Sequence, residues 1–220
     1  MKKLLSLVLA LLMLTSVSLA IHAEDLEGVN KDNIPNADKL AEELLTKDSE
    51  EAFRSWARAC TTVIILMKDA AYNCATGIYG YATGEGYSDD EKYVATIKAM
   101  MIGEDMWSVT VPVEKNSKEN TFTDLNNAVV GYRNLLSYQP LLLKLVALMP
   151  EVPTKYSKVS AMIETAQNKL SACADAFTKW ANGETSQDTM DLWGVAEPLY
   201  WDTSINTLVG IFYMDSQLNE

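Results

Sequence analysis

Apolar residues recur three and four positions apart over most of the 220-residue chain, and this spacing restricts the fold more than any other feature. The clearest example lies between Pro153 and Gly183 and comprises Tyr156, Val159, Ile163, Ala166, Leu170, Cys173, Phe177 and Trp180. Such spacing places the apolar residues on one face of an α-helix, and a neighbouring helix has to cover that face. We therefore predict a long amphipathic helix that ends at Gly183, because glycine favours helix C-termini.

The same periodicity predicts further helices in the first half of the chain. A second long helix is expected over 48–82, and a short one precedes it at 38–45. A third should begin at the capping box formed by Ser88 and Glu91. The segment 107–113 alternates apolar and polar residues, but a lone strand has no partner and this one contains a proline. We expect an irregular connection there.

Proline and glycine divide the two remaining helical regions. The helix that begins near Asp124 meets Pro140, which should kink or split it. The last helix begins near Thr185 and should break around 194–204, where glycine, proline and polar residues gather. Each amphipathic face must be covered by a neighbour. We therefore predict an all-α fold, a single antiparallel bundle of four to five principal helices over 36–220.

The N-terminus has the pattern of an export signal. A basic start at Lys2, an apolar run over 4–14 and small residues up to Ala23 predict a secretory signal peptide over 1–23. An uncleaved membrane anchor is the alternative, but the run is shorter than the roughly 20 residues that a spanning helix needs. We expect cleavage to leave an acidic linker at 24–35 and a chain of bacterial type, periplasmic or extracellular, that does not span the membrane.

Charge and histidine content exclude several classes of function. The chain has 18 Lys and Arg against 30 Asp and Glu, a net charge of −12, which disfavours nucleic acid and anionic lipid as partners. The acids gather in 24–51 and 184–220, and the second range contains no Lys or Arg. The single histidine, His22, belongs to the predicted signal peptide, so histidine-dependent catalysis and metal sites are not expected. We predict neither a metal nor a cofactor.

Six aromatic residues are the candidate contact residues for a ligand or partner: Tyr79, Tyr81, Tyr87, Trp193, Tyr200 and Trp201. The three tyrosines before residue 88 stand among glycines in 77–93. Flexible backbone and aromatic faces occur together in this way at protein and glycan contacts. The other three would line the cavity of a carrier if the bundle encloses a small apolar ligand. Core packing is the competing interpretation for both groups.

The three cysteines of an exported chain allow one disulfide and one remaining thiol. Cys60 and Cys74 lie on one predicted helix, about 21 Å apart at 1.5 Å per residue, which is too far for a bridge. A disulfide would therefore join Cys173 to Cys60 or to Cys74. Buried free thiols are the alternative.

Taken together, these features predict a secreted, acidic binding or interaction module rather than an enzyme. Its partner would be a protein or a glycan surface. Two alternatives come from other classes. The first is an extracytoplasmic carrier that encloses a small apolar ligand between helices, and the second is a hydrolase without histidine that uses two carboxylates.

Overall fold

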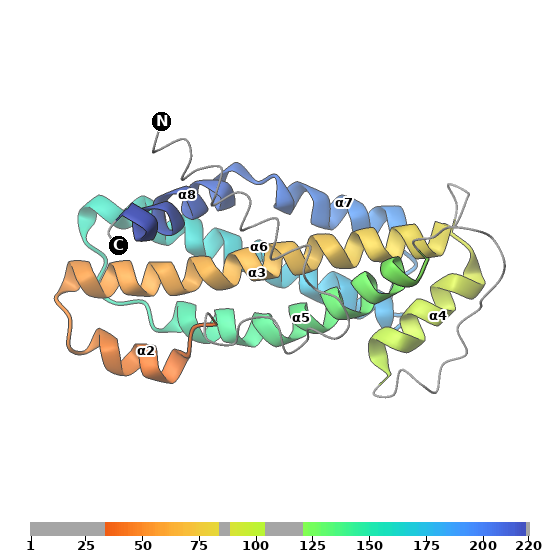
Figure 1. Ribbon diagram of the computed structural model, residues 1–220, viewed down its shortest axis with the longest axis horizontal. Helices are drawn as coiled ribbons and strands as arrows, with labels where there is room; N and C mark the ends of the chain where they lie inside the picture. Colours follow the sequence, from red (N-terminus) through yellow and green to blue (C-terminus); the bar gives the residue numbers. More distant parts are fainter. Residues whose placement is uncertain (1–33, 84–88, 104–120, 219–220) are drawn as a thin grey trace. The chain divides into compact units, whose positions relative to one another are not determined.

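The computed structural model describes residues 34–83, 89–103 and 121–218, and every regular element in these ranges is helical (Figure 1). In chain order the elements are α2 (Ala37–Leu44), α3 (Ser49–Thr83), α4 (Glu91–Ile102), α5 (Thr121–Ala147), the 3-10 turn η4 (Thr154–Tyr156), α6 (Ser157–Ala181), α7 (Thr189–Tyr200) and α8 (Thr203–Leu218). The predicted all-α class is thus confirmed. The predicted signal peptide, most of the acidic linker and the segment 107–113 lie outside the described residues. None of the described helices combines the length and apolar character that crossing a membrane requires.

Several helix ends form as the sequence predicts. The Asp48 carboxylate caps the start of α3 by accepting the backbone N–H groups of Glu50 and Glu51, at 3.0 and 2.9 Å. Gly183 follows α6 with a φ of 73°, a conformation that residues other than glycine rarely adopt. The last helical region is interrupted after Tyr200, within the predicted range, and continues as α8.

Other boundaries differ from the prediction. The last helical region begins at Thr189, after its N-cap Asp188, and not near Thr185. The N-cap of α4 is Asp90, whose side chain accepts the Lys92 N–H at 2.9 Å, and the predicted cap Ser88 lies outside the described residues. Pro140 lies inside α5 without ending it. The proline removes one backbone donor, but Leu142 and Leu145 beyond it are fully buried. Their burial stabilises the continuing helix.

The chain divides into two compact units, which we call unit 1 and unit 2. Unit 1 contains the described residues of 1–65, 141–167 and 203–220, and unit 2 contains those of 66–140 and 168–202. The helices α3, α5 and α6 therefore contribute residues to both. Buried apolar side chains occur in both units.

Aromatic residues at the start of α3 form the centre of unit 1. Phe53 and Trp56 are fully buried, and the Trp56 indole N–H donates to the Leu145 carbonyl at 2.7 Å. That carbonyl lies in the last turn of α5, where backbone oxygens lack helical partners. Tyr156 stacks on Phe53 with 4.9 Å between ring centroids and donates its hydroxyl to Glu50 at 3.0 Å. Each of these three rings therefore contacts another ring of unit 1.

In unit 2, α3 and α5 meet backbone to backbone. A Cβ added at Gly131 of α5 would lie 2.7 Å from the Cys74 nitrogen and 2.8 Å from the Ala70 oxygen. Gly77 of α3 has equally little room, because the Ala128 backbone occupies the place of its missing side chain. Glycine is required at both crossing points. These contacts fix the second half of α3, which also carries the candidate site.

Candidate functional site

Carboxylates hold the first turn of α7 in place within unit 2. The Asp188 side chain accepts the Asp191 N–H at 2.8 Å, and the Asp191 side chain accepts the Asp188 N–H at 3.3 Å, which completes a capping box. Asp89, distant in sequence, accepts the Thr189 N–H at 3.0 Å and the Thr189 hydroxyl. A helix N-terminus has partial positive charge, so these carboxylates stabilise it. Anchored in this way, α7 lies alongside the second half of α3 (Figure 1).

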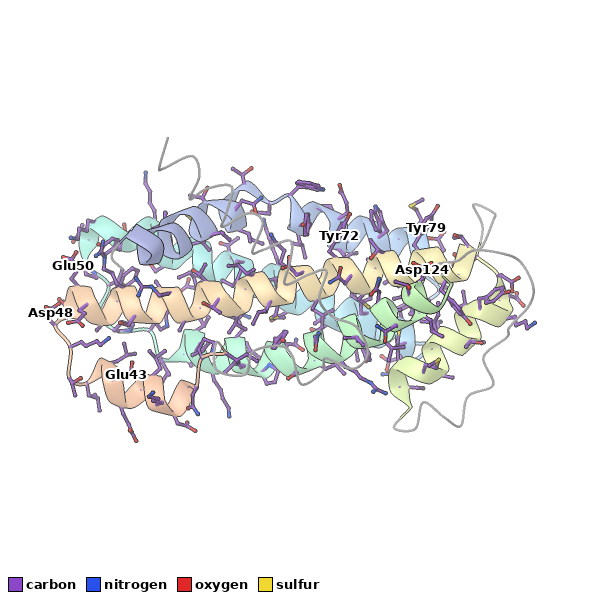
Figure 2. All side chains as sticks on the ribbon, viewed as in Figure 1. Glu43, Asp48, Glu50, Tyr72, Tyr79 and Asp124 are labelled. Carbon is purple, nitrogen blue, oxygen red and sulfur yellow. The ribbon has the colours of Figure 1, made fainter. Side chains whose placement is uncertain are left out.

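Five side chains from α3, α7 and the C-cap of α7 form what we call the aromatic cluster: Tyr72, Tyr79, Trp193, Tyr200 and Trp201. The Tyr72 ring stacks on Tyr200 with 4.3 Å between centroids and lies 5.4 Å from Trp193. Trp193 is 6.3 Å from Tyr79, and Tyr200 meets Trp201 edge-on at 5.0 Å. Figure 2 shows Tyr72 and Tyr79 on the side of α3 next to α7. The rings therefore form one continuous group.

The aromatic cluster is partly open to solvent. Tyr72, Tyr79, Trp193 and Tyr200 are half-buried, and 63% of Trp201 is exposed. Tyrosine and tryptophan with one packed face and one wet face are typical of binding surfaces. The cluster can therefore offer aromatic area to a second molecule while its own packing holds the rings in place.

Two charged residues of α3 border the aromatic cluster. The Lys68 Nζ lies 4.6 Å from the centroid of the Tyr200 ring and 3.9 Å from the Asp69 carboxylate. Burial lowers the pKa of Lys68, and burial raises the pKa of Asp69 to about 6 against the opposing effect of the Lys68 charge. Burial, and then the Asp69 charge, raise the pKa of Tyr200. The cluster thus already holds one cation against an aromatic face, beside a carboxyl group whose pKa is about 6.

The six candidate residues occupy three environments. Four of them belong to the aromatic cluster: Tyr79, Trp193, Tyr200 and Trp201. Tyr81 is only 2% exposed and meets Tyr93 edge-on at 5.1 Å, so its ring packs α3 against α4. Burial raises the pKa of Tyr81 to about 12. Tyr87 lies outside the described residues.

Tyr72, Lys68 and Asp69 were not among the site residues predicted from the sequence. Tyr72 and Tyr79 are seven positions apart, so they share one face of a helix, and that face differs from the buried one that carries Cys74. This spacing is a signal that could have joined Tyr72 to the candidate set. The sequence contains no comparable signal for Lys68 and Asp69, because a charged pair on a helix is usually solvated.

All three cysteines are fully buried free thiols. Burial raises the pKa of Cys173 to about 12 and raises those of Cys60 and Cys74 above the usual range, which suppresses thiolate chemistry. Cys74 and Cys173 belong to unit 2, and Cys60 belongs to unit 1. A disulfide from Cys173 to either of the others stays a prediction. Among the described residues, no group of three His, Cys, Asp or Glu side chains is arranged to hold a metal ion.

Comparison with known proteins gives no assignment. No protein-family model matches the sequence, and no curated protein or solved structure matches the chain. The chemistry and geometry of the residues themselves are therefore the basis for a function. Among the described residues, the aromatic cluster contains more partly exposed rings than any other group of contacting rings.

Proposed function

We propose that this protein is a secreted, non-enzymatic binding module with an antiparallel helical bundle fold, and that the aromatic cluster is its contact surface for another protein. The observation that carries the proposal is the cluster itself, in which neighbouring tyrosines and tryptophans keep solvent-facing area. Tyrosine and tryptophan supply a large share of the binding energy at protein interfaces, because they bury much area at little entropic cost.

The surroundings of the cluster suit recognition of a partner without chemistry. The rings stand on helices, and the capping box and Asp89 fix the start of α7. Little ordering is then needed when a partner binds, which favours affinity. The predicted signal peptide over 1–23 would deliver the chain outside the cytoplasm, and the net charge of −12 favours neutral or basic partners.

A capture experiment with matched variants tests this function. The mature chain, Trp201→Ala and Leu45→Ala are immobilised and exposed to the extracytoplasmic fraction of the producing cells. Leu45 is the control because it is 88% exposed and belongs to unit 1. We expect the wild type and Leu45→Ala to capture the same polypeptide. Once purified, that polypeptide should bind Trp201→Ala at least about tenfold more weakly than it binds the wild type. Equal binding to both variants would exclude the aromatic cluster as the contact surface.

Native mass spectrometry of the chain recovered from the same cells distinguishes the carrier alternative from the binding module. We expect the mass of the mature chain without a retained small molecule. A bound small mass that is lost in Trp193→Ala would make the aromatic residues part of a ligand site, as a carrier requires. That result would replace the binding module by the carrier.

A further inference from the structure

The side-chain carboxylates on α7 and next to it differ in whether they have a hydrogen-bond or ion-pair partner within the chain. Asp188 and Asp191 form the capping box, and Asp202 accepts a hydrogen bond from the Lys169 ammonium at 2.6 Å. Glu197 is the fourth carboxylate of this stretch. Within the part of the chain that the structure describes, the Glu197 side chain makes no hydrogen bond or ion pair. The residue is half-buried.

Two indoles flank Glu197. Trp193 precedes it by four positions, and Trp201 follows it by four positions as the C-cap of α7. Residues four apart lie on the same face of a helix, one turn from each other. Glu197 is therefore about one turn along the chain from each of these two tryptophans of the aromatic cluster, and Trp201 is 63% exposed.

Two residue choices on this face are unfavourable for α7 itself. Glu197 occupies the last turn, where the helix dipole disfavours negative charge. Gly194 is a poor helix former, yet a Cβ added there would meet no described atom within 4 Å, so packing of the described residues does not demand a glycine. It leaves bare backbone one turn from Met190, which is 52% exposed. Local choices that disfavour the helix without a packing reason often mark a functional surface.

We infer that the face formed by Trp193, Gly194, Glu197 and Trp201 binds an arginine side chain in a basic segment of the protein partner. This inference rests on the proposed function and specifies the chemistry of its partner. A guanidinium group donates two parallel hydrogen bonds to a carboxylate and stacks on an aromatic face. An anionic partner would be repelled by Glu197. Burial of the same face by an uncharged partner would leave Glu197 unpaired at a cost in affinity.

Two observations near this face support a cationic partner. Lys68 already lies 4.6 Å from the Tyr200 ring centroid, so the aromatic cluster holds a cation within the chain. The range 184–220 contains no Lys or Arg. Residues 184–202, the part of this range that belongs to unit 2, therefore carry a negative charge, which speeds the approach of a basic segment.

Peptide titration tests the arginine specificity. The probes are blocked Gly-Ser peptides of equal length that carry arginine, lysine or glutamate at the same positions. Binding is followed by the indole N–H resonances of the isotope-labelled mature chain. We expect the arginine peptide to bind best, the lysine peptide more weakly and the glutamate peptide not at all. The resonances of Trp193 and Trp201 should shift, while those of the buried Trp56 and Trp180 should not.

Glu197→Gln is the deciding variant. It should lower the affinity for the arginine peptide about tenfold, while Glu164→Gln should leave that affinity unchanged. Glu164 is an exposed residue of α6 in unit 1, so the two variants change the net charge equally. Glu197→Gln should fold normally, because it removes an unfavourable charge from a helix C-terminus. Equal losses in the two variants would reduce the effect to net charge and overturn the inference, as would full affinity in Glu197→Gln.

Failure of this inference and failure of the proposed function give different results. If a captured polypeptide requires Trp201 but the arginine peptide fails to bind or ignores Glu197, the arginine site is wrong and the contact surface stands. If neither the polypeptide nor the peptide depends on Trp201, both proposals fall together.

Discussion

Phe53 and Trp56 of unit 1 and Tyr72 and Tyr79 of unit 2 all lie on α3, yet the two pairs are used differently. The first pair is fully buried, and the indole N–H of Trp56 donates a hydrogen bond to a backbone carbonyl. The second pair is half-buried and belongs to a cluster that reaches the exposed Trp201. An aromatic residue on a helix is therefore core or contact surface according to whether its faces are already occupied within its own unit.

Replacing one tryptophan from each group should give the largest contrast. We expect Trp56→Ala to lower the free energy of unfolding by about 3–5 kcal/mol, because it opens a cavity in the core of unit 1. It also deprives the Leu145 carbonyl of its donor. Trp201→Ala should change stability by less than about 0.5 kcal/mol. Urea unfolding followed by circular dichroism measures both values, and similar losses would contradict the division into core and contact aromatics.

The next largest difference between the units should be in how their stability changes with pH, because the carboxyl group of Asp69 in unit 2 is buried. Its pKa in the folded chain is raised from 3.8 to about 6 by burial. A raised folded pKa means that the protonated form stabilises the fold at low pH and that this contribution is lost as the pH rises through about 6. The contribution amounts to about 3 kcal/mol at most, at 1.36 kcal/mol per pKa unit.

Asp69→Asn removes this titration and should flatten the stability profile between pH 4 and 7, in which range the wild type loses stability. Unfolding curves measured across that range test the prediction. Glu164→Gln is the control, since its carboxylate is exposed. If stability fell with pH by the same amount in the wild type, Asp69→Asn and Glu164→Gln, Asp69 would not be the titrating group.

Much of this organisation could be predicted from the sequence, and the part that could not has a common cause. Helical periodicity and capping residues such as Asp48 and Gly183 act locally, so they gave the all-α class and several helix ends. Pro140 was misleading, because the burial of Leu142 in the following turn compensates for its missing donor. Tyr72 shares a helix face with Tyr79, but its role depends on Trp193 of α7, more than a hundred residues away, and helical spacing does not show which helix covers that face.

Two glycines offer a smaller test of where the helices touch. Gly131→Ala should cost about 2 kcal/mol, because the new Cβ would lie 2.7 Å from the Cys74 nitrogen and the backbones must separate. Gly194→Ala meets no described atom within 4 Å and should instead stabilise the chain by up to about 1 kcal/mol, through helix propensity. Thermal unfolding of the two variants gives the signs. A stable Gly131→Ala would contradict the close contact of α3 and α5.

The smallest effect should come from the exposed ion pair of unit 1, which contrasts with the buried pair of unit 2. Glu50 accepts hydrogen bonds from Lys155 at 2.6 Å and from Tyr156 at 3.0 Å, and these lower the pKa of Glu50. A lowered folded pKa stabilises the fold above the unfolded value of 4.5, and this contribution is lost as the pH falls through the folded value.

We therefore expect Glu50→Gln to be slightly less stable than the wild type at neutral pH and low salt, and equal to it in acid. High salt should also remove the difference, because both partners are solvent-exposed and screening reaches them. The pH effect of Asp69 should persist in the same salt, since burial rather than a partner charge is its main cause. Thermal midpoints at two salt concentrations decide the matter. If high salt abolished the pH effect of Asp69 as well as that of Glu50, Asp69 would be as accessible to solvent as Glu50. The charged residues that border the aromatic cluster would then be solvent-exposed.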